Sequence, residues 1–145
     1  MLKKIVALAA LALATSSSAL SAPGGCHAVS GTFVNHNIPC TVPAVACVES
    51  EVTGGLAGVT ITIVTSYDPV THVYAGTVTN NLENGAVLTS TIVGTTFNGF
   101  GQSTETLTGG TRQFAHVTGS TAEAGVNGAG TYTADYCLGQ VGGDD

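Results

Sequence analysis

Beyond its first 22 residues this chain has almost no positive charge, because Arg112 is the only lysine or arginine there. All nine carboxylates lie in the same part, and the formal net charge of −6 at pH 7 becomes about −8 without Lys3 and Lys4. A protein needs several cations to displace the counterions of nucleic-acid phosphates or to bind an anionic membrane. We therefore expect neither a nucleic acid nor an anionic membrane as a partner.

The chain also lacks a hydrophobic run long enough to span a membrane. The longest run, residues 5–14, is about half of the roughly 20 residues that a spanning helix needs. It follows two lysines and precedes small residues, which is the pattern of a secretory signal peptide at residues 1–22. Cleavage after Ala19, Ser21 or Ala22 would fit this pattern. We expect a soluble mature chain, exported by a bacterium into the periplasm or the medium.

Four cysteines lie in the exported part, and an even number in an oxidising compartment predicts two disulfides. Of the three possible pairings we expect Cys40 with Cys47, across a short segment, and Cys26 with Cys137, at the two ends of the domain. The second bond would close a loop of about 110 residues and stabilise the fold by about 4 kcal/mol in the chain-entropy model. Two alternatives are disfavoured: a zinc site has no CxxC pair, and Cys26 as a lipid anchor lacks the usual preceding aliphatic residue.

Helix signals are absent after the signal peptide, and β-branched residues alternate with polar or small ones, which is typical of strands. Asn-Gly pairs at 84–85, 98–99 and 127–128 predict tight hairpins, because they tolerate the positive φ angles of such turns. The predicted strands are 27–38, 48–54, 59–67, 72–82, 86–97, 100–108, 116–124 and 130–138.

The clearest strand, residues 59–67, has two distinct faces. The more apolar face is predicted to be the core face, and the other is predicted to point outward. The first carries Val59, Ile61, Ile63 and Tyr67, and the second carries Thr60, Thr62 and Ser66.

The sequence thus predicts one all-β domain, residues 23–145, built as an antiparallel meander of about eight strands. An antiparallel barrel or a sandwich would fit the strand spacing. Closure into a barrel is favoured because it removes edges on which Thr/Val-rich strands would aggregate. Residues 139–145 are an acidic, Gly-rich segment that we expect to be a flexible tail.

Residues 107–119 read Leu-Thr-Gly-Gly-Thr-Arg-Gln-Phe-Ala-His-Val-Thr-Gly. Two glycines allow a sharp exit from a strand, and Phe114 can fold under the turn and plug one end of a barrel. This stretch resembles the GGTGxF...ATG element of the allene oxide cyclase-like and dirigent-like β-barrels, which include small secreted bacterial proteins. The similarity extends to residues 97–101 and 128–133 and to the loop 40–47, about half of the mature chain.

The resemblance implies a calycin-like eight-stranded barrel, a fold whose members are often oligomeric. Arg112 and Gln113 stand where the pattern favours glycine and then a basic residue, and His116 stands where a small residue is usual. No catalytic residue carries over from the family, because the acids of its characterised plant members fall outside the matching part. The resemblance therefore bears on fold rather than on activity.

An eight-stranded barrel is either packed or just wide enough for one small ligand. With one methionine, no tryptophan and eight Phe and Tyr residues, the chain has little bulk to fill a barrel, which favours a cavity over ordinary core packing. If the barrel is hollow, we expect an apolar lining with hydroxyls that orient a ligand. The candidate ligand-binding residues are Tyr67, Tyr74, Phe97, Tyr132 and Tyr136.

Two carboxylates are placed in mid-strand. Glu105 shares a face with Leu107, and Asp135 shares one with Thr133 and Cys137. A buried carboxyl has a raised pKa and could act as a general acid, which makes these two the candidate catalytic residues. The alternative is that each simply faces water.

Arg112, the single mature cation, could hold the carboxylate of a ligand bidentately. The alternative is a pair with one of the protein's own acids. In the first case Arg112→Ala should abolish anion binding, and in the second it should destabilise the fold.

Metal-site and nucleophile patterns are missing. The four histidines lack ligand spacing, and no Ser, His and acid form a recognisable motif. Glu49 and Glu51 share a strand face, but two ligands are too few for calcium. We expect no metal and no cofactor, and surface or turn positions for His27, His36, His72 and His116.

The sequence favours a secreted, disulfide-stabilised barrel that binds a small molecule or is structural, without catalysis. The alternatives are a cofactor-independent cyclase or isomerase acting on an apolar substrate inside the barrel, with Glu105 or Asp135 as the acid, and an extracellular adhesion protein. The expected partners are a small apolar or anionic ligand and a second copy of the chain. These functions can be distinguished by whether the interior of the barrel is empty or packed.

Overall fold

The computed structural model describes residues 25–139. The predicted signal peptide, residues 1–22, and residues 140–145 of the predicted tail lie outside the described residues. Within the described range no helix is long and apolar enough to cross a membrane.

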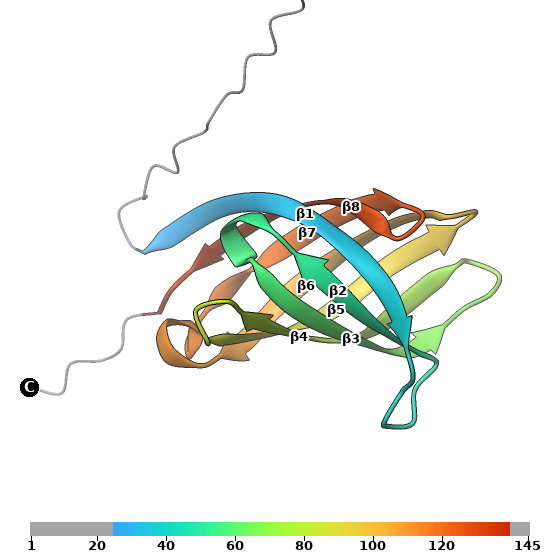
Figure 1. Ribbon diagram of the computed structural model, residues 1–145, viewed down its shortest axis with the longest axis horizontal. Helices are drawn as coiled ribbons and strands as arrows, with labels where there is room; N and C mark the ends of the chain where they lie inside the picture. The colour runs from blue at the N-terminus through green and yellow to red at the C-terminus, as the bar shows by residue number, and fades with distance from the viewer. Residues whose placement is uncertain (1–24, 140–145) are drawn as a thin grey trace, which may run out of the picture.

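Eight antiparallel strands form a single closed barrel, in which each strand pairs with the next along the chain and β8 pairs with β1 (Figure 1). The predicted all-β class and eight-stranded meander are confirmed, and each predicted strand boundary lies within two residues of the observed one. The strands are β1 (Cys26–Ile38), β2 (Ala46–Val52), β3 (Gly58–Tyr67), β4 (Val73–Leu82), β5 (Val87–Phe97), β6 (Phe100–Gly110), β7 (Thr118–Val126) and β8 (Ala129–Cys137). Two short 3-10 helices, η1 (Gly54–Leu56) and η2 (Arg112–Phe114), lie in connections.

All three predicted Asn-Gly hairpins form, but with two backbone conformations. At 98–99 and 127–128 both residues have positive φ angles, between 49° and 80°, as a two-residue hairpin turn requires. In the β4–β5 connection only Gly85 has a positive φ, of 81°. There the amide of Leu82 donates to the carbonyl of Ala86, so the connection has three residues rather than two.

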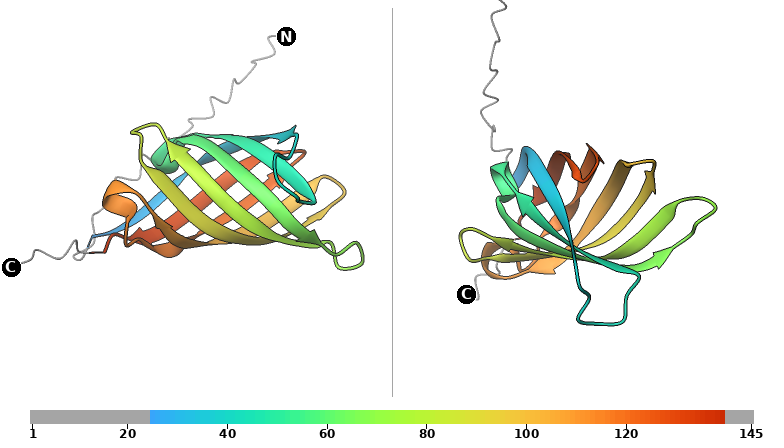
Figure 2. Two further views of the ribbon diagram at one scale, coloured as in Figure 1. Left: turned by 90° about the horizontal axis from the view of Figure 1, so that it is seen from below. Right: turned by 45° about the vertical axis from the view of Figure 1, so that its right-hand side comes forward.

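The two ends of the barrel differ. At one end lie η1, η2 and the β4–β5 turn (Figure 2). They cover a packed core, into which Phe114 folds as the predicted plug. At the other end lie the β1–β2 and β3–β4 loops and the two-residue Asn-Gly turns. We call these the closed end and the open end. The core of the closed end consists of Leu56, Leu82, Ala86, Leu88, Leu107, Phe114, Val117, Tyr132 and Ala134.

Both predicted disulfides are present. Cys26 and Cys137 join β1 to β8, the pair of strands that closes the barrel. Cys40 and Cys47 close the loop that leads from β1 into β2, near the open end. The protein is therefore a disulfide-stabilised barrel, and its two bonds are compatible with an oxidising compartment outside the cytoplasm.

The predicted core face of β3 is wrong. Val59 is 40% exposed, whereas Thr60, on the opposite face, is only 8% exposed. The interior beside this strand is lined with small polar side chains, so the more apolar face is not the inner one. Tyr67 nevertheless points inward, because a register shift between Val64 and Ser66 inserts an extra residue and reverses the alternation.

Candidate functional site

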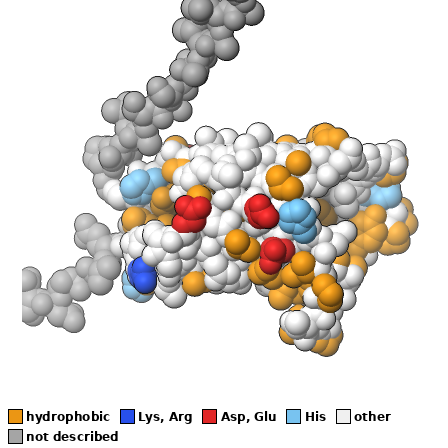
Figure 3. All heavy atoms as spheres, in the orientation of Figure 1, with side chains coloured by type: hydrophobic (Ala, Val, Ile, Leu, Met, Phe, Trp, Pro, Cys, Tyr) orange, Lys and Arg blue, Asp and Glu red, His pale blue; other side chains and the backbone are white. Residues whose placement is uncertain are grey.

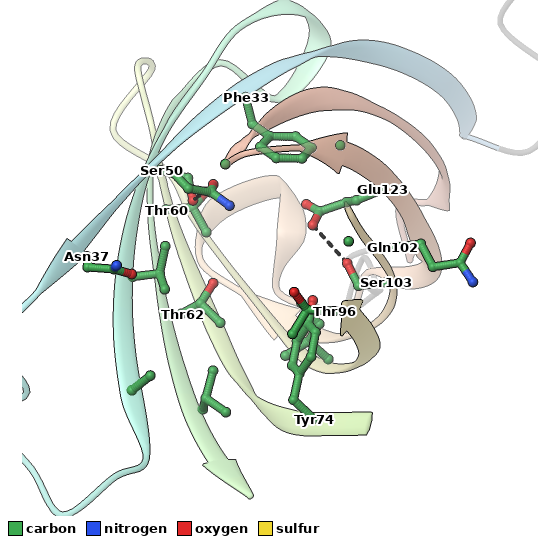
Figure 4. A pocket seen from close by; sticks show the side chains of 18 of the residues that line it. Phe33, Asn37, Ser50, Thr60, Thr62, Tyr74, Thr96, Gln102, Ser103 and Glu123 are labelled. Carbon is green, nitrogen blue, oxygen red and sulfur yellow. Dashed lines mark hydrogen bonds between the residues drawn. The ribbon is translucent and has the colours of Figure 1, made fainter. Parts of the chain in front are cut away.

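A cavity of about 350 Å³ occupies the open half of the barrel (Figure 4). Side chains of all eight strands reach it, because alternate residues of each strand point inward. Its wall mixes apolar side chains such as Phe33 and Ile92 with the hydroxyls of Ser50, Thr60 and Thr62. The barrel is therefore hollow on one side of its core.

Tyr74 forms part of this wall because a glycine makes room for its ring. Tyr74 on β4 is paired with Gly94 on β5. A Cβ atom at position 94 would lie 2.6 Å from the Tyr74 ring and 2.6 Å from the carbonyl oxygen of Gln102, closer than real contacts allow. The ring thus lies directly over the bare backbone of β5.

Two glutamates lie side by side on the inner wall. Glu105 on β6 is paired with Thr121, and Glu123 on β7 is paired with Ser103, so the two glutamates are diagonal neighbours. Each accepts a hydrogen bond from a serine hydroxyl: Ser90 Oγ lies 2.6 Å from Glu105 Oε2, and Ser103 Oγ lies 3.0 Å from Glu123 Oε2 (Figure 4 shows the second bond).

Burial, and then the charge of Glu123, raises the pKa of Glu105 to about 7, although the hydrogen bond from Ser90 acts in the opposite direction. Glu105 is only 8% exposed. Within the described residues no lysine or arginine lines the cavity to balance these carboxylates. The site therefore changes its charge near neutral pH.

Burial also raises the pKa of Tyr74, and the charges of Glu123 and Glu105 add to the effect, while a hydrogen bond with Ser103 opposes it. The Tyr74 hydroxyl therefore stays protonated at neutral pH, as a neutral polar group on the wall of the cavity.

A small chamber of about 20 Å³ lies deeper in the barrel and shares Thr60, Glu105 and Glu123 with the large cavity. Its volume is that of about one water molecule. Asn80 on β4 also lines it; its Nδ2 donates to the carbonyl of Leu56 at 3.2 Å, but its buried Oδ1 has no hydrogen-bond partner. The chamber thus holds an unpaired acceptor next to two carboxyl groups.

Tyr132 closes the chamber on the β8 side. Its hydroxyl donates to the carbonyl of Thr53 at 2.8 Å and accepts from the amide of Leu56 at 2.9 Å. Burial raises its pKa. Since both functions of the hydroxyl are used, Tyr132 anchors the β2–β3 connection.

The five aromatic candidates are spread along the barrel. Tyr67 and Tyr74 line the cavity, and Tyr132 lines the chamber below it. Tyr136 packs at the closed end, 5.8 Å from the ring of Phe114. Phe97 is 57% exposed near the open end, where it contacts the ring of His72.

Of the two acid candidates only Glu105 points inward, on the same face as Leu107, as predicted. For Asp135 the alternative holds, and the residue faces water: it is exposed, because Ala134 and Tyr136 are the inward residues of that part of β8. Sequence reasoning missed Glu123. The available signal was its alternation with Thr121 and Gly125 on a strand that follows Glu105 by one hairpin.

Arg112 lies at the closed end, away from the cavity. Its Nη1 donates to the backbone carbonyl of Asn84 at 2.6 Å, and its guanidinium lies beside Gly85. The side chain thus ties η2 to the β4–β5 turn through a carbonyl, rather than through one of the protein's acids as the second alternative expected.

The outer surface carries few charged groups (Figure 3). Among residues 25–139 no three His, Cys, Asp or Glu side chains lie together as metal ligands would. His36 Nε2 lies 3.7 Å from Glu51 Oε1 on exposed side chains of β1 and β2. Apolar side chains gather toward the open end, where Val42, Val45 and Val70 are exposed.

Comparison of the chain with protein-family models, curated proteins and solved structures found no match.

Proposed function

We propose that this protein is an exported binding barrel that takes a small molecule with an apolar body into its open half. The cavity carries this proposal. Its volume of about 350 Å³ falls in the range of about 300–1,000 Å³ that is usual for small-molecule sites. A packed interior would have argued for a purely structural barrel.

The wall has the composition that such a site needs. Phe33, Val48 and Ile92 offer apolar surface, and the hydroxyls of Thr62 and Tyr74 offer a few directed polar contacts. The disulfides and strand closure hold the wall without a ligand, so binding would cost little ordering of the protein. We therefore expect the cavity to have the same shape with and without a ligand.

A neutral fluorescent dye tests the proposal. Prodan should bind with saturation and a blue-shifted emission, because the cavity excludes water from an apolar ring. Thr62→Phe, which fills the cavity, should abolish the signal. Val59→Phe is the matched control, since Val59 lies on the same strand with its side chain exposed outside. Equal dye binding by both variants, or none by the unmodified protein, would refute the proposal.

Glu105 favours a second candidate function, a cofactor-independent cyclase or isomerase, which also fits the resemblance to the allene oxide cyclase-like barrels. A carboxyl with a pKa of about 7 on the wall of the cavity can donate a proton to an apolar substrate at neutral pH. The protein would be incubated with a panel of apolar epoxides and polyenes, and the products would be separated by chromatography. Turnover that survives Glu105→Gln would exclude Glu105 as the acid.

A further inference from the structure

We propose that the ligand of this barrel carries a protonated amine, which Glu105 and Glu123 hold at the floor of the cavity while an apolar body fills the space above. The inference rests on the proposed function and names the chemical class of the ligand.

The floor of the cavity has hydrogen-bond acceptors to spare. An ionised carboxylate offers about four acceptor positions. Ser90 donates to Glu105 and Ser103 donates to Glu123, and the Glu105 carboxyl, while it is protonated, also forms a hydrogen bond with Glu123. The remaining acceptor positions are available to a ligand, and within the described residues no cationic side chain lines the cavity.

The unpaired side-chain oxygen of Asn80 independently favours a ligand that donates hydrogen bonds. Asn80 is only 8% exposed, and its Oδ1 is buried without a partner in the chamber that Glu105 and Glu123 also line. An unpaired buried acceptor costs about 1–3 kcal/mol, so a donor that enters the chamber gains by satisfying it. The structure thus gathers three acceptor side chains around one small space.

An ammonium head fits this space better than other polar groups do. It has three donors and no acceptor, and its size is close to that of the one water molecule that about 20 Å³ accommodates. A hydroxyl has one donor and no charge, and a carboxylate would be repelled by both glutamates. The expected order of affinity is therefore amine, alcohol, carboxylate.

The preference should depend on pH. The titratable groups that face Glu105 are Glu123 from β7, Tyr74 from β4 and Tyr132 from β8. Glu105 ionises as the pH passes about 7. A primary amine keeps its charge to about pH 10. Binding of the amine should therefore strengthen as the pH rises from about 5.5 to about 8.5, whereas binding of the alcohol should not.

Calorimetric titration of the purified protein with three compounds of one carbon skeleton tests this. At about pH 8, phenylbutylamine should bind about tenfold or more tightly than phenylbutanol, and phenylbutanoate should bind most weakly. Lowering the pH to about 5.5 should weaken the amine by about tenfold. These two measurements use the unmodified protein and do not depend on any variant.

A double variant, Glu105→Gln with Glu123→Gln, should lose the preference for the amine and still bind the alcohol. The control removes the same charge from the outer surface, with Glu51→Gln and Glu83→Gln, both exposed, and should keep the preference. Thermal melting checks that both fold.

Two outcomes separate this inference from the proposed function. Prodan binding together with an alcohol that binds as tightly as the amine, or with no binding of the amine, would overturn the inference alone. Failure of prodan and of all three compounds would overturn the proposed function as well.

Discussion

The protonation of Glu105 depends on the residues around it in the folded barrel. A carboxylate on a strand usually faces water. Glu105 instead lies on the inner side of β6, where its neighbours are the hydroxyl of Ser90 and the carboxylate of Glu123. Burial of a proton-binding group at this point makes the stability of the folded chain depend on pH.

The free energy of unfolding should fall as the pH rises from about 4.5 to about 7. In this window the raised pKa of Glu105 means that the folded state keeps a proton that the unfolded state has released. Glu105→Gln cannot ionise, so above about pH 7 it should be more stable than the unmodified protein by on the order of 2 kcal/mol. Urea unfolding at several pH values measures this. Glu83→Gln is the exposed control, and an unchanged slope in Glu105→Gln would contradict the assignment.

Pairing between neighbouring strands determines which glycines are needed to make room for a large side chain. The ring of Tyr74 crosses β5 at Gly94, whereas Gly101 on β6 has only the carbonyl oxygen of Thr95 near the position of an added Cβ, at 3.7 Å. These two glycines therefore differ in role, although both lie in the β5–β6 hairpin and look alike in the sequence.

Gly94→Ala should lower the free energy of unfolding by about 1–3 kcal/mol, because the added methyl group meets a ring and a backbone carbonyl. It should also weaken dye binding by displacing Tyr74 from the cavity wall. Gly101→Ala, the matched control, should change the free energy of unfolding by less than about 0.5 kcal/mol. Thermal melts of both variants and a dye titration of Gly94→Ala measure this, and equal losses of stability in both variants would show that the Tyr74 contact does not matter.

A disulfide joins the first and last strands of the barrel, β1 and β8. The Cys26–Cys137 bond spans 111 residues and joins the strands that close the sheet, whereas the Cys40–Cys47 bond spans 7 residues within one loop. In the chain-entropy model the longer loop restricts the unfolded chain more.

Replacing Cys26 and Cys137 with serine should therefore lower the free energy of unfolding by about 4–5 kcal/mol, and replacing Cys40 and Cys47 by about 2–3 kcal/mol. Chemical denaturation of the two double variants, with mass spectrometry to confirm the remaining bond, gives both values. A larger loss from the short loop would mean that the loop conformation, rather than chain entropy, dominates.

Strand positions, the meander order and both disulfides follow from local patterns. Alternation of side chains, Asn-Gly turns and cysteine placement act over a few residues or through simple chain order, so they can be predicted before any contact is known. The plug formed by Phe114 belongs to the same group, because it depends on the glycines and the turn immediately beside it.

The inner face of β3, the outward orientation of Asp135 and the pairing of Glu105 with Glu123 were decided only when the barrel closed. Alternation shows that a strand has two faces, but it does not show which one is inside when the interior is hollow and polar. The register between β6 and β7 then places two glutamates, 18 positions apart in the sequence, on one wall. The candidate site is thus a product of closure and register, which no single segment of the chain contains.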